Sequence, residues 1–219
     1  RARVRGADGV QSRAGSLAAR AGRAAGMADH APGKLRPISA ELATRLAREA
    51  EAAHATDTPV EAVVERLGAA RAEAEALAEP DDGAALFEAE LVHAYRAARR
   101  AMAAAREGSD EQLFHDWRKR VKHHYHLSRM AKGAGPSTAK TVVSDLDALG
   151  DLLGLEHDHA VLAARLLDDP LLAGNGRAAD RIHEVIDTRR GKLQKKAFRL
   201  GRTLYAEGPK AFRAGFDLD

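Results

Sequence analysis

The sequence predicts an all-α protein. Ala, Leu, Arg and Glu dominate its 219 residues and aromatic residues make up only 4%. This mixture is rich in helix formers and poor in the β-branched and aromatic residues that strands favour. After residue 84, clusters of Gly, Pro and Asp divide the chain into four long segments joined by short connections, a count typical of a helical bundle.

The first part of the chain is expected to contribute two helices. Residues 1–37 are rich in Gly, Arg and Ala, lack a sustained apolar period and end in APGKLRP. They predict a loop or poorly ordered segment, with at most a short Ala-rich helix at residues 16–25. A Ser cap predicts a helix over residues 39–54. The turn TDTP follows it, and because its Pro is suited to a first helical turn, a second helix is predicted over residues 59–78.

Four longer helices are expected to follow. The start of each of these helices is marked by a segment rich in helix-breaking or capping residues. In chain order these segments are EPDDG, EGSD, a Gly-Pro cluster, and DDP with AGNG. The expected ranges are 85–106, 111–131, 137–167 with a kink at Gly154, and 177–205, and a short segment follows Pro209.

The charge is unevenly distributed along the chain. The net charge is only +3, but residues 91–132 carry 10 basic against 4 acidic residues and residues 177–202 carry 9 against 3, or +6 in each. Residues 41–90 carry 4 against 13, or −9. Concentrated positive charge predicts a focused field and an anionic partner, although ordinary solvated helix faces would also account for it.

The segment FHDWRKRVKHHYHLSRM, residues 114–130, separates into two faces on a helical wheel. Phe114, Trp117, Val121 and Tyr125 form an apolar stripe that is expected to face the core. The stripe beside it contains six basic side chains and no acid: His115, Arg118, Lys119, Lys122, His126 and Arg129. Their mutual repulsion is expected to be compensated by an anionic ligand, most commonly phosphate, in a groove beside the core.

Two other helices are expected to add basic flanks to this groove. The helix over residues 85–106 places four Arg residues beside its apolar side: Arg96, Arg99, Arg100 and Arg106. The helix over residues 177–205 repeats cations at three- or four-residue intervals: Arg189, Lys192, Lys196 and Arg199. Of the histidines in the central segment, His123 is expected to face away from the groove and His124 to border the core.

A metal site is not expected. The stretch EHDH at residues 156–159 resembles a ligand cluster, but adjacent helical residues point about 100° apart and cannot all face one ion. The spacings HxxxH and HExxH are absent, and so is Cys, which excludes disulfides, thiolate nucleophiles and Cys-ligated metals. Nothing in the sequence predicts a cofactor.

Three functional classes remain open. The dipeptide of His157 and Asp158 is similar to that of metal-dependent phosphohydrolases, which keeps a phosphohydrolase or triphosphatase as an alternative. A basic groove also suits RNA or DNA, but Trp117 and Tyr125 lie on the core stripe and leave no stacking platform for bases. A non-enzymatic phosphate-binding module is the preferred hypothesis. With no membrane span or signal peptide evident, we expect a cytoplasmic protein.

Several segments together resemble the CHAD family, the conserved histidine α-helical domain. They are YRAARRAM at residues 95–102, HDWRKRVKHHYHL at 115–127, LGDLLGLEHDHAVL at 149–162 and RRGKLQKKAFRLGRTLYAEGPKAF at 189–212. The resemblance implies two four-helix bundles around a basic groove or pore that binds inorganic polyphosphate, and no catalysis. Within a domain over residues 38–219, it implies that residues 38–83 are the remnant of a first bundle and residues 84–213 form the second.

The resemblance also implies which residues bind polyphosphate. The family motif H-x-x-R-K-x-x-K falls on His115, Arg118, Lys119 and Lys122. Its basic Tyr-Arg helix falls on Arg96, Arg99 and Arg100, and its HD helix on His157. A second basic H-x-x-R helix, expected in the first half of the family domain, is not found in residues 1–83. Binding of polyphosphate in the cytoplasm further suggests an association with polyphosphate granules; the oligomeric state is not predicted.

Overall fold

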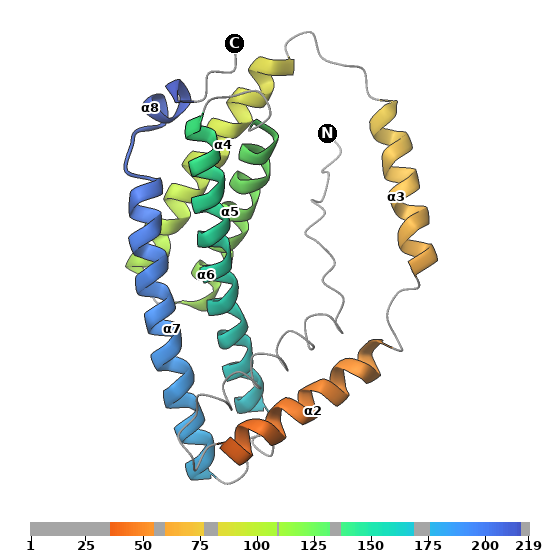
Figure 1. Cartoon of the computed structure of the whole chain (residues 1–219), viewed down its shortest axis with the longest axis vertical. Helices are drawn as coiled ribbons and strands as arrows, with labels where there is room; N and C mark the ends of the chain where they lie inside the picture. The colour runs from red at the N-terminus through yellow and green to blue at the C-terminus, as the bar shows by residue number, and fades with distance from the viewer. Residues whose placement is uncertain are drawn as a thin grey trace. The chain divides into compact units, whose positions relative to one another are not determined.

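The computed structural model describes residues 36–54, 60–76, 83–108, 110–131, 137–168 and 176–215. Helices account for nearly all of these residues, and they include no strand. In chain order the helices are α2 (Arg36–His54), α3 (Val60–Glu75), α4 (Gly83–Glu107), α5 (Glu111–Ala131), α6 (Ser137–Asp168), α7 (Gly176–Leu204) and α8 (Pro209–Ala214). The all-α prediction is confirmed (Figure 1).

The helix limits follow the expected ones with few differences. The limits of α5 match residues 111–131, and α6 continues through Gly154 without a break in its helical assignment. One expectation was wrong, because α2 begins at Arg36 and so includes two residues assigned to the preceding loop. Pro37 is compatible with this earlier start because Pro is tolerated in a first helical turn. The short helix expected at residues 16–25 lies outside the described residues.

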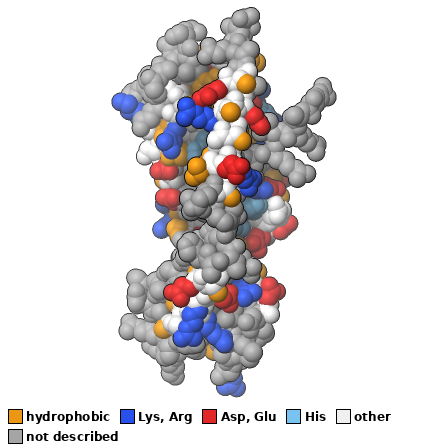
Figure 2. Space-filling view, turned by 90° about the vertical axis from the view of Figure 1, so that its right-hand side faces the viewer, with side chains coloured by type: hydrophobic (Ala, Val, Ile, Leu, Met, Phe, Trp, Pro, Cys, Tyr) orange, Lys and Arg blue, Asp and Glu red, His pale blue; other side chains and the backbone are white. Residues whose placement is uncertain are grey.

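The chain divides into two compact units. The first comprises Arg1–Ala78 and Ala164–His183, and the second comprises Glu79–Ala163 and Glu184–Asp219. In the first unit, Leu46 of α2 is fully buried, and Arg165 of α6 donates to both carboxylate oxygens of Glu49 at 3.1 Å. On the face shown in Figure 2, acidic and basic side chains of the described residues lie interspersed with apolar ones.

In the second unit, α4, α5, α6 and α7 run side by side around an apolar core (Figure 1). Trp117 of α5 is fully buried and stacks on Phe198 of α7, with ring centroids 5.0 Å apart. A Cβ at Gly201 would lie 3.0 Å from Cζ2 of Trp117 and 2.7 Å from the sulfur of Met102. Glycine at this position therefore allows α7 to approach the indole ring closely.

An aromatic cluster attaches α8 to this bundle. The Tyr95 hydroxyl donates to the carbonyl oxygen of Glu207 at 2.7 Å, and the Tyr95 ring stacks on Phe212 with centroids 4.1 Å apart. His124 is 1% exposed and packs edge-on against both of these rings. Burial raises the pKa of Tyr205, whose ring also lies against His124. The cluster therefore holds α8 against α4 and α5.

Candidate functional site

Two helices of the second unit bring together His115, Arg118 and His157, which we call the His–Arg cluster. The rings of His115 on α5 and His157 on α6 have centroids 5.0 Å apart and planes inclined by 37°. A Cβ at Gly154 would lie 3.8 Å from Nε of Arg118, so the guanidinium lies over the α6 backbone one turn before His157. These three residues were all predicted as ligands, and the structure places them in one cluster.

The sequence of α5 explains how this cluster is positioned. Before the helix starts, Asp110 Oδ1 accepts a hydrogen bond from the backbone N–H of Gln112 at 3.1 Å, as expected of a capping side chain. Phe114, Trp117 and Val121 then turn one face of α5 into the core. The residues one step further around the helix, including His115 and Arg118, consequently lie at the edge of that face beside α6.

Two nitrogens of the cluster have unused hydrogen-bonding capacity. His115 Nδ1 and Arg118 Nε are both buried, and neither has a hydrogen-bond partner among the described residues. Buried polar atoms are normally satisfied, and an unsatisfied one costs about 1–3 kcal/mol. Guanidinium and imidazolium N–H groups both donate to oxyanions. The cluster therefore has the donors that a bound phosphate oxygen requires.

The protonation of His157 depends on its surroundings. Burial lowers its pKa below the ordinary value, and the neighbouring His115 and Arg118 lower it further. Asp158 on the same helix and Glu111 on α5 act in the opposite direction but are outweighed. His157 is therefore mainly neutral near pH 7, and a nearby anion would favour its protonated form.

A buried ion pair next to His157 joins α6 to α7. Glu156 is 1% exposed, and its Oε1 accepts from Nε and Nη2 of Arg190 at 3.0 and 2.9 Å and from Nε2 of Gln194 at 2.9 Å. The carboxylate is thus compensated by a guanidinium and an amide. Sequence reasoning missed Arg190, because only its cationic neighbour Arg189 fitted the spacing of the expected basic flank.

The other residues of the EHDH stretch also point in different directions. His159 is buried, and its Nδ1–H donates to the carbonyl oxygen of Leu155 at 2.7 Å. No group of three His, Cys, Asp or Glu side chains suited to a metal ion occurs in the part of the chain that the structure describes.

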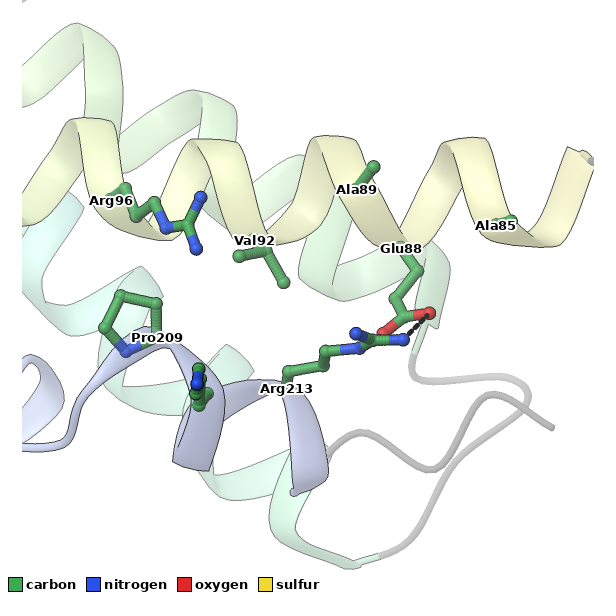
Figure 3. Close-up of a pocket in the computed structure, with 8 residues that line it drawn as sticks. Ala85, Glu88, Ala89, Val92, Arg96, Pro209 and Arg213 are labelled. Carbon is green, nitrogen blue, oxygen red and sulfur yellow. Dashed lines mark hydrogen bonds and ion pairs between the residues drawn. The ribbon is translucent and has the colours of Figure 1, made fainter.

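The remaining predicted ligands lie at the surfaces of three helices. His126, Lys119 and Lys122 are exposed on α5, and Arg99 and Arg100 are exposed on α4. On α7, Arg189 is half-buried, whereas three cations are exposed: Lys192, Lys196 and Arg199. Arg96 lines a separate hollow between α4 and α8 (Figure 3). Among the described residues, no hydrogen bond or ion pair joins these side chains to the His–Arg cluster, and their part in binding stays a prediction.

The predicted division of the α5 histidines is confirmed for two of them. His123 Nε2 lies 3.0 Å from Glu90 Oε1 on α4 and so pairs with an acid of the neighbouring helix. His124 is buried in the aromatic cluster, where burial and, less strongly, His123 lower its pKa to about 3. Neither histidine contributes to the His–Arg cluster.

A comparison with protein-family models identifies the fold family. The model of the CHAD domain matches residues 2–167. The chain belongs to the CHAD family. The match covers the His–Arg cluster and residues 2–83, of which residues 38–83 were expected to be the remnant of a first bundle, and it ends before the segment at residues 189–212. Searches of curated proteins and of solved structures gave no match.

None of the described helices is apolar enough over a sufficient length to cross a lipid bilayer.

Proposed function

We propose that this CHAD protein binds inorganic polyphosphate as a non-enzymatic module. The observation that carries the proposal is the His–Arg cluster, in which His115 Nδ1 and Arg118 Nε are buried without hydrogen-bond partners among the described residues. Membership of the CHAD family supports it, because domains of this family bind polyphosphate-related substrates. Cytoplasmic location and association with polyphosphate granules belong to the same proposal.

In the proposed complex, phosphate oxygens accept every contact. Arg118 presents a planar guanidinium to one phosphate, and the imidazoles of His115 and His157 add donors beside it. The half-buried Arg189 and exposed cations of α4, α5 and α7 would hold the following phosphates of the chain: Lys119, Lys122, His126, Arg99, Arg100, Lys192, Lys196 and Arg199. Long chains should bind more tightly than short ones because they engage more of these cations at once.

Binding of polyphosphate should be tighter at pH 5.5 than at pH 7.5. His157 has a lowered pKa in the free protein because of burial, His115 and Arg118. A bound phosphate raises that pKa, so protonation and binding reinforce each other, and each pKa unit gained corresponds to roughly tenfold in affinity at low pH. Dissociation constants at pH 5.5 and 7.5 should differ less for the variant His157→Gln than for the wild type.

The exposed His93 of α4 provides the control for this measurement. Its only described acidic partner is Glu90, and it lies outside the cluster. The variant His93→Gln should keep the wild-type pH dependence. Equal pH dependence in the wild type and in His157→Gln would show that His157 does not contact the ligand.

The proposal is tested by titrating the protein with long-chain polyphosphate, single-stranded RNA and ATP at physiological salt, with and without EDTA, while phosphate release is assayed. Polyphosphate should bind most tightly of the three, and EDTA should not change its affinity. The affinity should fall steeply with increasing salt through counterion release. Tighter binding of RNA would assign the groove to nucleic acid. EDTA-sensitive phosphate release would assign His157 and Asp158 to a metal-dependent phosphohydrolase.

A further inference from the structure

A cavity lies between α4 and α8. It has a volume of about 380 Å³ and is lined by eight residues: Ala85, Glu88, Ala89, Val92, Arg96, Pro209, Lys210 and Arg213 (Figure 3). This volume is at the lower end of the range of small-molecule sites. We call it the α4–α8 hollow; all of its residues belong to the second unit.

Contacts outside the hollow hold its two walls in place. The Tyr95 hydroxyl binds the carbonyl oxygen of Glu207 just before α8, and Phe212 of α8 stacks on the Tyr95 ring. Pro209 fixes the backbone at the first position of α8. Across the hollow, Arg213 pairs with Glu88 through Nε and Nη2 (Figure 3). These contacts hold the two walls of the hollow in one arrangement, which reduces the entropic cost of binding.

The lining combines an apolar surface with an excess of positive charge. Ala85, Ala89, Val92 and Pro209 contribute the apolar part. Glu88 compensates Arg213, whereas Arg96 and Lys210 have no ion-pair partner among the described residues. Two uncompensated cations next to an apolar wall favour a ligand that has both an anionic group and a compact apolar body. Inorganic polyphosphate offers the anionic groups alone.

We propose that the α4–α8 hollow binds a small organic anion, a carboxylate or phosphate ester attached to a compact apolar group. Its anionic group lies between Arg96 and Lys210, and its apolar part packs against Val92, Ala89 and Pro209. This assigns Arg96 to a site of its own rather than to the polyphosphate groove. The inference does not depend on the proposed polyphosphate function.

The test is calorimetric titration of the full chain with four probes: phenyl phosphate, benzoate, inorganic phosphate and phenol. Phenyl phosphate or benzoate should bind at least tenfold more tightly than inorganic phosphate and phenol, because only these two probes engage both parts of the lining. A preference between them identifies the headgroup. Arg96→Gln and Lys210→Gln should each weaken that binding about tenfold or more, because each removes one charged contact.

Two further variants make the result specific. Ala89→Phe should fill the hollow and abolish probe binding without changing any charge, whereas Arg106→Gln, an exposed cation further along α4, should have no effect. Unchanged binding in Arg96→Gln, or inorganic phosphate binding as tightly as phenyl phosphate, would overturn the proposal. The Gln variants at exposed positions decide the matter even if Ala89→Phe fails to fold.

A competition experiment separates this hollow from the polyphosphate groove. Saturating long-chain polyphosphate should not displace bound phenyl phosphate, and Lys210→Gln should keep its affinity for polyphosphate. Displacement would show that the hollow is part of the polyphosphate path and would refute a separate site. A protein that binds no polyphosphate but binds phenyl phosphate would refute the proposed function and leave this inference standing.

Discussion

Replacing Arg118, Lys119 and Lys122 together by Ala should weaken the binding of long-chain polyphosphate at least about a hundredfold at physiological salt. A hydrogen bond to a charged group contributes roughly 1.5–3 kcal/mol, so the loss of even two such contacts predicts this change. Arg118 matters most, because its buried Nε has no partner among the described residues and lies beside His157. The helix content should not change, since all three residues lie beside the buried face of α5 rather than on it.

The salt dependence of binding provides an independent measure of the same contacts. If the three side chains each neutralise one phosphate, their removal should make the negative slope of log K against log salt less steep by about two to three. Affinity should be measured at several salt concentrations by fluorescence anisotropy of labelled polyphosphate, with circular dichroism to check folding.

A matched triple variant separates specific contacts from net charge. Arg120, Lys195 and Arg202 are exposed cations on α5 and α7 that lie outside the predicted site. Replacing these three by Ala removes the same charge but should weaken binding only slightly, through the long-range field. If both triple variants lose affinity equally, the positive charge as a whole attracts the polyphosphate and the His–Arg cluster is not the site.

The single variant Arg118→Lys tests the geometry of the contact. A Lys ammonium keeps the charge but has neither the planar fork nor the Nε donor of the guanidinium. We expect an intermediate affinity and a salt slope close to that of the wild type. An affinity equal to that of the wild type would show that Arg118 acts only as a point charge.

The fold of the second unit follows from local sequence signals. The limits of α5 were predictable because the cap Asp110 and the Gly-Pro breaks are local, and its buried face because Phe114, Trp117 and Val121 keep a helical period. Gly154 could not be interpreted in this way. The helix α6 continues through it, the expected kink stays a prediction, and a Cβ at this position would lie 3.8 Å from Arg118 Nε of another helix, a contact that no local signal indicates.

The candidate site was predictable only in part, because it depends on contacts between helices that are far apart in the sequence. A wheel shows which residues share one helix face, so His115 and Arg118 were found together. It does not show which helix faces them. His157 entered through the family resemblance, and Arg190 was missed because its partner Glu156 is 34 residues away along the chain. Arg96 belongs to the basic residues of α4 that were expected to line the groove. In the structure it lines the α4–α8 hollow.

The structure also predicts that acid weakens the second unit through His124. This side chain is 1% exposed, its Nε2 has no hydrogen-bond partner among the described residues, and Nδ1 lies 3.4 Å from the Tyr205 hydroxyl. Burial, with a smaller contribution from His123, lowers its pKa to about 3. In the unfolded chain the same imidazole titrates near its ordinary value of about 6.5.

The direction of the effect follows from proton linkage. Between pH 6.5 and pH 3 the unfolded chain binds a proton at His124 that the folded protein does not, so the free energy of unfolding falls as the pH is lowered. At pH 4 this difference amounts to roughly 3 kcal/mol, a large part of the stability of a typical domain. The variant His124→Phe should lack this contribution because a phenyl ring takes up no proton.

The measurement is urea unfolding of both proteins at pH 7 and pH 4. The wild type should lose about 3 kcal/mol more than His124→Phe over this interval, whatever the absolute stability of the variant. His93→Gln, which removes an exposed histidine, should lose as much as the wild type. Since His124 packs on Tyr95 and Phe212, this loss would loosen the anchor of α8. Equal losses in the wild type and His124→Phe would show that His124 is protonated without unfolding, and that the aromatic cluster accommodates its charge.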